Sequence, residues 1–454
     1  MELQCIMYHH LRNISLNNYF SKLRDQSLLV NTAKLSVSNI IMYVLPIVVT
    51  PILSRLYGPS AFGEWGIFSS FTSIVAIVMF LSIDNIIVKA EEEELGNLLV
   101  LCGGIGLMAI SLLCVAFALF DIYDSVFCYM IIIYMLAYFV YTIVYNLNNR
   151  YGNYSKLAVS NVLQGATQAI ARISLGVFFL GVINGLVCGT ILAEIITSLF
   201  LCFSLFKIDT RKWATVTTKG VKTLLVKYRK FPLFDAPSNL LAFSTLNLPI
   251  IILAGTFSKS SIGCFSIVLQ LLLLPMSLVG SAMGKVYYQE LCSAAGDSQR
   301  IEKMSESILN ILLMVSVTPM LLLCCGGDYL VVLFLGDSWT TAGHVALILS
   351  LWSFPVILTQ PLLPLFRAYN IQNVLLRYDI LYFVGGIGSL LICCYCSCSM
   401  FATLIVYAAI CALVKFALFH KMASLVNYNL FNHRMALSVW VFAVSLLVVR
   451  LILL

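Results

Sequence analysis

Charged residues are scarce in this sequence. Asp, Glu, Lys and Arg make up 10% of its 454 residues, whereas soluble globular domains average about 25%. Apolar and aromatic residues make up 61%, and a membrane-spanning helix needs about 20 of them in a row. These proportions exclude a soluble enzyme. They predict an all-helical protein that crosses a membrane many times and leaves little room for a folded domain outside it.

Several motifs are also absent. The 15 cysteines include no spaced pair of C-x-x-C motifs, so no metal site is expected, and we expect the cluster at residues 393–398 to be small filler rather than a redox site. No phosphate-binding P-loop is present. Any energy source must then be a gradient of substrate or ions, with proton or sodium coupling as the options, and no cofactor is expected. The first 30 residues lack the apolar core of a signal peptide, so we expect no cleavage.

Apolar stretches of membrane-crossing length recur along the whole chain. We predict spans at residues 35–56, 66–88, 97–120, 126–147, 157–181, 184–206, 231–256, 262–287, 306–326, 343–366, 375–396 and 400–420, with a thirteenth apolar run at 436–454. The thirteenth run leaves the C-terminal topology open.

The placement of the basic residues predicts the orientation. With the N-terminus inside, 23 of the 27 Lys and Arg residues fall in the inner connections, three lie within spans, and Lys259 alone lies outside. Because basic residues resist translocation, this bias places the N-terminus in the cytoplasm. The net charge of +7 is therefore expected to serve topology and contact with anionic lipid headgroups rather than nucleic acid.

The longest and most basic connection divides the spans into six before and six after, so both halves have the same orientation, as in a parallel repeat. Residues 60–65 (SAFGEW) and 260–265 (SSIGCF) share the pattern S-x-x-G-x-aromatic, 200 residues apart. We predict a cytoplasmic segment at 1–34, a six-helix lobe at 35–206, a basic cytoplasmic loop at 207–230, a second six-helix lobe at 231–420, and a linker with the candidate thirteenth span at 421–454.

Prolines occur at matching places in the two halves. Span one carries Pro46 and Pro51, and span seven carries Pro232, Pro237 and Pro249. Because proline bends a helix, bendable helices at matching positions indicate the moving parts of a transporter. A role in packing alone is the alternative.

Six blocks of sequence resemble a known family. They are residues 51–59 (PILSRLYGP), 62–65 (FGEW) and 84–88 (DNIIV) in the first half, and residues 228–238 (YRKFPLFDAPS), 247–249 (NLP) and 274–282 (LPMSLVGSA) in the second. In order and spacing, over about residues 33–420, the sequence resembles the Wzx-type oligosaccharide flippases of the multidrug/oligosaccharidyl-lipid/polysaccharide (MOP) exporter superfamily.

The resemblance implies two MATE-like lobes that form a V around a central cavity. It implies a transporter, not an enzyme, that moves an undecaprenyl-diphosphate-linked oligosaccharide from the cytoplasmic to the periplasmic leaflet by alternating access. The process served would be O-antigen, capsule or exopolysaccharide synthesis at the bacterial inner membrane. Membrane lipids, a polysaccharide polymerase and a chain-length regulator are the further partners that it implies.

Three charged residues within spans are candidate substrate-binding residues, because charge at bilayer depth is costly. Arg172 and Glu194 fall at matching depth on neighbouring spans. Arg172 is predicted to bind the diphosphate, with Glu194 as its partner or as a proton or cation site. A structural ion pair is the alternative, since it would neutralise the charge that a diphosphate needs. Arg55, at the outer end of span one, is predicted to contact phosphate or to extend to the outer headgroups.

Polar residues within the spans are candidates for binding sugar hydroxyls. Asn161, Gln164 and Gln168 share one face of span five with Arg172, at spacings of three and four residues, and Asn247 lies in span seven. Unpaired amides are costly in hydrocarbon, so this face should not meet lipid. Hydrogen bonding between helices is the competing interpretation.

A second group of charges falls at the cytoplasmic ends of spans. Its members are Asp84, Asp235, Lys285, Arg377 and Asp379. They are predicted to form an inner gate, with simple placement at the membrane interface as the alternative. Residues 91–94 (EEEE) are expected to form a solvated turn, with pairing to the basic loop as the alternative.

Two other functions compete with the flippase. A cation-coupled multidrug antiporter of the same superfamily should have a compact acidic and aromatic site, but Glu194 is the only acid at mid-depth. A membrane polymerase or glycosyltransferase that uses the same lipid carrier should have a large outer loop with catalytic acids. The outer connections here are too short for that.

Overall fold

The computed structural model describes residues 34–35, 37–42, 44–119, 124–179, 181, 183–205, 216–229, 231–293, 298–369, 371–428 and 434–452. In this part of the chain all regular elements are helices. Ten of the described helices are long and apolar enough to cross a membrane. The prediction of an all-helical, multi-pass membrane protein is therefore confirmed.

The first half contains six long helices. They are Val37–Leu56, α2 (Pro59–Phe80), α3 (Leu95–Leu119), α4 (Ser125–Arg150), α5 (Tyr154–Phe178) and α6 (Gly185–Leu205). α7 (Thr218–Lys227) follows within the predicted basic loop. The second helix begins seven residues before the predicted span, because a proline fits the first helical position, where no backbone N–H donor is needed.

The second half has one broken span. Its helices are α8 (Ala236–Ala254), α9 (Lys259–Ser293), α10 (Ser298–Leu322), α11 (Asp328–Leu335), α12 (Thr340–Thr359), α13 (Pro364–Ala368), α14 (Gln372–Tyr395) and α15 (Met400–Leu425). Between α10 and α11 lies a π-helical turn, Leu323–Gly327, in which Gly326 has a φ of 120°. Glycine adopts this backbone region without strain, so the chain can change direction here, just before Asp328.

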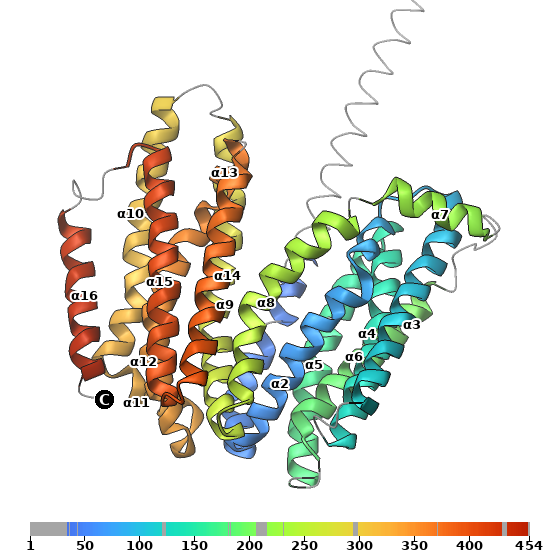
Figure 1. The fold of residues 1–454 in the computed structure, drawn as a ribbon, viewed down its shortest axis with the longest axis horizontal. Helices are drawn as coiled ribbons and strands as arrows, with labels where there is room; N and C mark the ends of the chain where they lie inside the picture. Colours follow the sequence, from blue (N-terminus) through green and yellow to red (C-terminus); the bar gives the residue numbers. More distant parts are fainter. Residues whose placement is uncertain are drawn as a thin grey trace, which may run out of the picture.

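Two groups of helices meet at one end of the molecule and diverge at the other (Figure 1). We call the closed end, where α11 lies, the α11 end, and the open end, where α7 lies, the α7 end. One group holds the helices of the first half and the other holds those of the second, while α8 packs against both α2 and α14. The predicted arrangement of two lobes in a V is confirmed.

The thirteenth apolar run also forms a helix, α16 (Arg434–Ile452), which packs against α10 and α12. Its Ala443 and Leu447 are buried in the second lobe. Near its end, Arg450 Nη2 lies 2.7 Å from Asp328 Oδ1, at the start of α11. This ion pair ties the last helix to the break in the ninth span.

The two lobes touch where the repeated motif occurs. A Cβ placed on Gly63 of α2 would lie 2.8 Å from the carbonyl carbon of Lys259, and one on Gly263 of α9 would lie 2.7 Å from that of Pro59. The 200-residue offset of the motif converts one pair into the other, because it relates Gly63 to Gly263 and Pro59 to Lys259. Only glycine allows the backbones to approach this closely. The crossing therefore relates the halves as a repeat.

Further contacts close the α11 end around this crossing. Ser54 Oγ donates a hydrogen bond to the Leu335 carbonyl at 2.7 Å, and Trp339 Nε1 donates to the Ser54 carbonyl at 3.0 Å. At the surface, Lys259 Nζ lies 2.8 Å from Glu64 Oε1. We call these contacts, together with the glycine crossing, the α11 seal.

At the α7 end, α7 lies across the first lobe (Figure 1) with Leu224 buried against it. Lys227 donates a hydrogen bond to Glu94 and lies 3.9 Å from Glu91. The hydrogen bond to Glu94 raises the pKa of Lys227. Glu91, Glu92 and Glu93 are exposed, as expected for a solvated turn, while Glu94 also pairs with the basic loop, as the alternative predicted.

Candidate functional site

The polar face of α5 points toward neighbouring helices. Asn161 is buried, and its Nδ2 donates to Asn39 Oδ1 at 2.7 Å and to Ser38 Oγ at 3.2 Å, both on the first helix. Gln168 Nε2 lies 3.5 Å from Thr190 Oγ1 on α6. Asn161 thus joins helices within the lobe, as the competing interpretation of the polar face predicted for it.

Glu194 lies in the middle of α6 and is buried. Gln164 Nε2 donates to its Oε2 at 2.8 Å, and Tyr141 Oη in turn donates to Gln164 Oε1 at 3.4 Å. The other carboxylate oxygen of Glu194, Oε1, is buried with no hydrogen-bond partner among the described residues. A buried carboxylate with a vacant oxygen is suited to hold a proton or a small cation.

Arg172 is also buried, but no ion pair joins it to Glu194 in the described part of the chain. Its Nη2 donates to Thr190 Oγ1 at 2.9 Å, and its guanidinium lies 4.9 Å from the centre of a Trp65 ring. Thr190 lies one turn before Glu194 on α6, and it is the hydrogen-bond partner of Arg172 in place of Glu194. The ion pair deduced from matching depth is therefore wrong, because Arg172 faces the preceding turn.

A small chamber of about 180 Å³ lies beside these residues, and we call it the deep chamber. It is lined by Gln164, Gln168 and Glu194 from the polar faces of α5 and α6, and by Trp65 from α2. Arg172 does not line it, because Trp65 and Thr190 stand in front of the guanidinium. The predicted contact of Arg172 with the diphosphate therefore finds no support in the lining of this chamber and stays a prediction.

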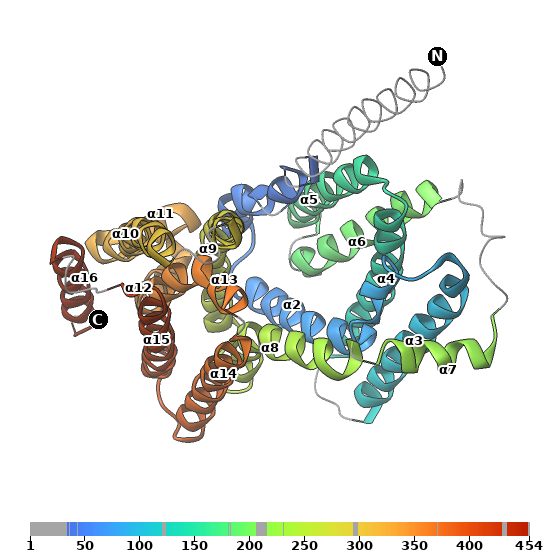
Figure 2. The same ribbon diagram turned by 90° about the horizontal axis from the view of Figure 1, so that it is seen from above.

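A wider chamber of about 250 Å³ lies nearer the α7 end. Thr72, Ser73 and Tyr134 line both chambers, so the two spaces adjoin along α2 and α4. Figure 2 shows α2, α4, α5 and α6 of the first lobe close together, with α8 of the second half alongside α2. The polar groups of the lobe therefore line one space that begins near its open end.

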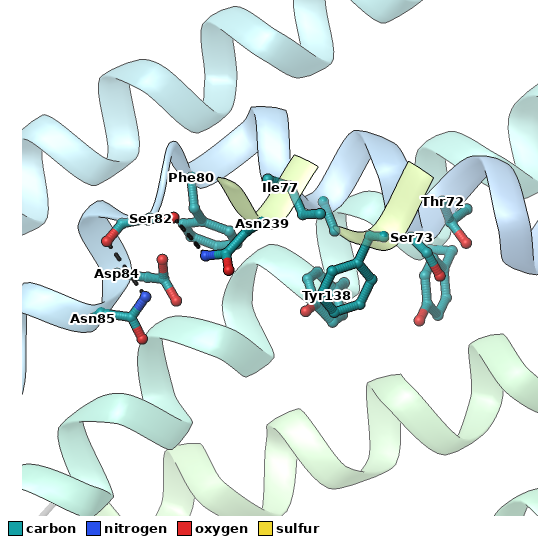
Figure 3. Close-up of a pocket in the computed structure, with 12 residues that line it drawn as sticks. Thr72, Ser73, Ile77, Phe80, Ser82, Asp84, Asn85, Tyr138 and Asn239 are labelled. Carbon is teal, nitrogen blue, oxygen red and sulfur yellow. Dashed lines mark hydrogen bonds between the residues drawn. The ribbon is translucent and has the colours of Figure 1, made fainter. Parts of the chain in front are cut away.

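The backbone turns sharply at the α7 end of the wide chamber. Leu81 and Ser82 have φ of 48° and 60°, a region that non-glycine residues seldom adopt and that is enriched at binding sites. The turn directs Asp84 and Asn85 into the chamber, where Asn239 of α8 joins them (Figure 3). Asp84 is therefore a chamber residue in this conformation.

Four tyrosines of α4 form a ladder that was not predicted. Tyr134, Tyr138, Tyr141 and Tyr145 have ring centroids 5.6 to 6.4 Å apart from one to the next. Their spacings of four, three and four residues are visible in the sequence and place them on one helical face. The first two rings line the wide chamber.

The predicted gate residues do not meet in this conformation. Asp235 is exposed at the end of a π-helical turn, Arg377 is exposed, and Asp379 is half-buried on α14. No ion pair joins these three or Asp84 within the described residues. The side chain of Lys285 lies outside the described part of the structure.

The two remaining predicted residues lie away from the chambers. Arg55 Nη2 donates to the Leu333 carbonyl at 3.2 Å, beside the α11 seal. Asn247 donates to the Phe243 carbonyl of its own helix at 2.9 Å. Neither residue lines the deep or the wide chamber.

The second lobe contains a polar cluster that sequence reasoning missed. Lys415 Nζ lies 4.5 Å from the centre of the Tyr382 ring, and Trp352 Nε1 donates to Tyr382 Oη at 2.5 Å. A single lysine in an apolar run carries no spacing signal. Its partners come from α12 and α14, so only the folded structure reveals the cluster.

Solved structures with this architecture define a class. An inward-facing multidrug-resistance MATE transporter of the MOP superfamily aligns with a TM-score of 0.64 and 15% identity, over 86% of this chain and 94% of that chain. The lipid II flippase MurJ in an inward closed conformation aligns with a TM-score of 0.60 and 12% identity, over 92% and 86%. A MOP-superfamily transporter from Pyrococcus furiosus aligns with a TM-score of 0.54 and 13% identity, over 87% and 95%. The chain has the fold of MOP-superfamily transporters, as predicted.

The family follows from the sequence itself. A family model described as polysaccharide biosynthesis protein matches residues 52–344, which is more than half of the chain. The chain belongs to this family. A search of curated proteins found no match.

Proposed function

We propose that this protein is a flippase for undecaprenyl-diphosphate-linked oligosaccharides, which it moves from the cytoplasmic to the periplasmic leaflet of a bacterial inner membrane by alternating access. The product would serve O-antigen, capsule or exopolysaccharide synthesis, where a polymerase and a chain-length regulator act next. The observation that carries the proposal is the pair of adjoining polar chambers behind the α11 seal. The family of polysaccharide biosynthesis proteins supports a glycan as the cargo.

The proposed orientation places the α7 end in the cytoplasm. α7 and the turn after it carry Lys219, Lys222, Lys227 and Arg229, and basic residues are retained on the cytoplasmic side. The wide chamber then faces the compartment in which lipid-linked oligosaccharides are assembled. The α11 seal separates it from the periplasm.

We propose distinct roles for the polar residues of the first lobe. Gln164 and Gln168 would hydrogen bond the sugar in the deep chamber, which they line. Arg172 would position Trp65 and Thr190, which it contacts. The diphosphate would remain near the α7 end, close to the headgroups. Asp235, Lys285, Arg377 and Asp379 keep their proposed role as an inner gate that closes in the outward-open state, while Arg55 belongs to the seal.

Coupling to a proton or sodium gradient is proposed at Glu194. Its unpaired Oε1 is the basis, because a proton or Na⁺ bound there would neutralise a buried charge. Glu194→Gln keeps the size and the partner Gln164, and it removes the titratable group. In this variant, transport should no longer respond to an imposed pH or sodium gradient.

The test uses the purified full-length protein in proteoliposomes that contain a fluorescent undecaprenyl-diphosphate-linked oligosaccharide. An impermeant quencher reports its movement between leaflets. Gln168→Leu, which removes the amide and keeps the bulk, should slow translocation by about two- to tenfold, the range expected for one lost hydrogen bond. Ile170→Ala is the matched control, because Ile170 is exposed on the same helix.

Two outcomes would reject the proposal. One is a wild-type protein that moves the lipid no faster than protein-free vesicles. The other is uptake of an organic cation such as tetraphenylphosphonium in place of the lipid, which would favour the multidrug antiporter. The acids Asp84 and Glu194 in the chambers make that outcome a meaningful alternative.

A further inference from the structure

The wide chamber has polar side chains at both ends and aromatic rings along its walls, with Thr72 and Ser73 at one end (Figure 3). Asp84, Asn85 and Asn239 gather at the other end, while Phe80 and Tyr138 stand along the wall (Figure 3). Flat apolar faces next to planar amides and a carboxylate match the two kinds of surface on a sugar ring. The C–H faces of a sugar stack on aromatic rings, and its hydroxyls donate and accept hydrogen bonds.

The charge of the lining narrows the class of ligand. Among the described residues, no Lys or Arg lines the wide chamber, and Asp84 is the only charged residue that does. A phosphate or a uronic acid placed here would meet a carboxylate without a compensating cation. The diphosphate of a lipid-linked substrate is therefore excluded from this space, and an uncharged part of the substrate fits.

The hydrogen bonds within the chamber leave acceptors for a ligand. Asn239 Nδ2 donates to Ser82 Oγ at 3.2 Å, and Asn85 Nδ2 lies 3.5 Å from the Ser82 carbonyl. These contacts use the amide nitrogens and hold the two side chains in place around the turn. Asn146 Nδ2 lies 3.5 Å from Asp84 Oδ2, and the backbone N–H groups of Asp84 and Asn85 also donate to this carboxylate. The amide oxygens of Asn85 and Asn239 have no partner among the described residues. Hydroxyl groups are donors suited to these oxygens and to the remaining lone pairs of the carboxylate.

We propose that the wide chamber is a sugar-reading subsite, which binds one uncharged ring of the translocated oligosaccharide. The inference rests on the proposed function and assigns the cargo's sugar to this space. Tyr134 and Tyr138 stack on the ring, and Asp84, Asn85 and Asn239 bind its hydroxyls. The tyrosine ladder extends along α4 beside the deep chamber, where Tyr141 contacts Gln164. A second sugar ring of the oligosaccharide binds against this face of α4. Specificity for neutral sugars over acidic ones arises at Asp84.

Saturation-transfer NMR of the purified full-length protein in detergent tests the subsite directly. The probes are neutral methyl hexosides and methyl N-acetylhexosaminides, a methyl hexuronide, and tetraphenylphosphonium. The neutral glycosides should receive saturation, and the hexuronide should bind at least about tenfold more weakly because of Asp84. Asp84→Asn keeps the shape and an acceptor, and it should narrow this difference.

Tyr138→Leu removes the stacking surface and keeps apolar bulk, so binding of the neutral glycosides should fall by about tenfold. Tyr129→Leu is the matched control, because Tyr129 is exposed on the same helix. Unchanged glycoside binding in Tyr138→Leu would overturn the proposal. Binding of tetraphenylphosphonium that depends on Asp84, with no glycoside binding, would overturn it as well.

The translocation assay separates this inference from the proposed function. If the wild type moves the lipid-linked oligosaccharide and both Tyr138→Leu and Asp84→Asn move it equally well, the subsite is wrong and the flippase stands. If glycosides bind and depend on Tyr138 but the wild type moves no lipid, the flippase is wrong and the chamber still binds sugar.

Discussion

Replacing Gly63 with alanine should open the α11 seal. The new Cβ would lie 2.8 Å from the carbonyl carbon of Lys259 and 3.2 Å from the backbone nitrogen of Gly263. Non-bonded carbon atoms normally stay 3.5 to 4.0 Å apart, so α2 and α9 must separate by about 1 Å at their crossing. The obstacle is backbone, which cannot rotate away as a flexible side chain can.

The free-energy cost of Gly63→Ala arises because the added methyl group overpacks a tight contact. Extra methyl groups in such contacts cost about 1–3 kcal/mol, and this cost falls only on the conformation in which the helices cross. The population of the sealed conformation relative to the open one should therefore fall by about 5- to 150-fold. Gly263→Ala meets the same obstacle from the other helix, so the double variant should shift the equilibrium by less than the sum of the two.

Labelling of a buried position measures the opening. In a background cleared of native cysteines, Ser54→Cys lies within the seal and should be protected from an impermeant thiol reagent added outside. Gly63→Ala should expose it and slow translocation. Gly103→Ala is the control: it raises helix propensity equally, and its Cβ meets no atom within 4 Å. Wild-type protection and transport in Gly63→Ala would refute the tight crossing.

Other contacts yield three more predictions. Glu64→Lys breaks the ion pair with Lys259 and should raise Ser54→Cys labelling by about two- to fivefold, the range for an exposed ion pair. Adding Lys259→Glu to the same chain should restore protection. Stronger labelling in the double variant than in Glu64→Lys would contradict a role of this ion pair in the seal. Arg450→Ala should lower the melting temperature of the purified protein by a few degrees, because it leaves a partly buried Asp328 unpaired. Asp328→Ala in the same chain should then lower the melting temperature little further. If the decreases from the two substitutions add up, the ion pair does not stabilise the protein. Reporter fusions in the loop 207–230 should show cytoplasmic activity, and a periplasmic signal there would reverse the proposed orientation.

The span positions and the repeat could be predicted from the sequence because both are local signals. A run of about 20 apolar residues is long enough to span the membrane, and the 200-residue offset relates Gly63 and Gly263, which meet at the close crossing of α2 and α9. The ninth span was predicted to end at residue 326, and the chain does change direction there, before Asp328. The short helix α11 that follows the break was not predicted, because eight residues are too few for a span.

The site was predicted less well because depth along a helix does not fix the direction of a side chain. Arg172 and Glu194 were placed at equal depth, yet Arg172 meets Thr190, one helical turn away from the acid. Asp84 was placed at a membrane end, but the turn at Leu81 and Ser82 carries it into a chamber. Neither residue favours a positive φ, so the sequence contains no sign of this turn.

The polar face of α5 has a consequence for how the chain enters the membrane. α5 has the length of a span, but it is not among the described helices apolar enough to cross alone. An arginine at the centre of an isolated helix costs about 2.5–3.5 kcal/mol during insertion, and Arg172 has amide-bearing neighbours on the same face. The partners Thr190 and Glu194 arrive only with α6. We therefore expect α5 to enter the bilayer together with α6, as a hairpin, during biosynthesis.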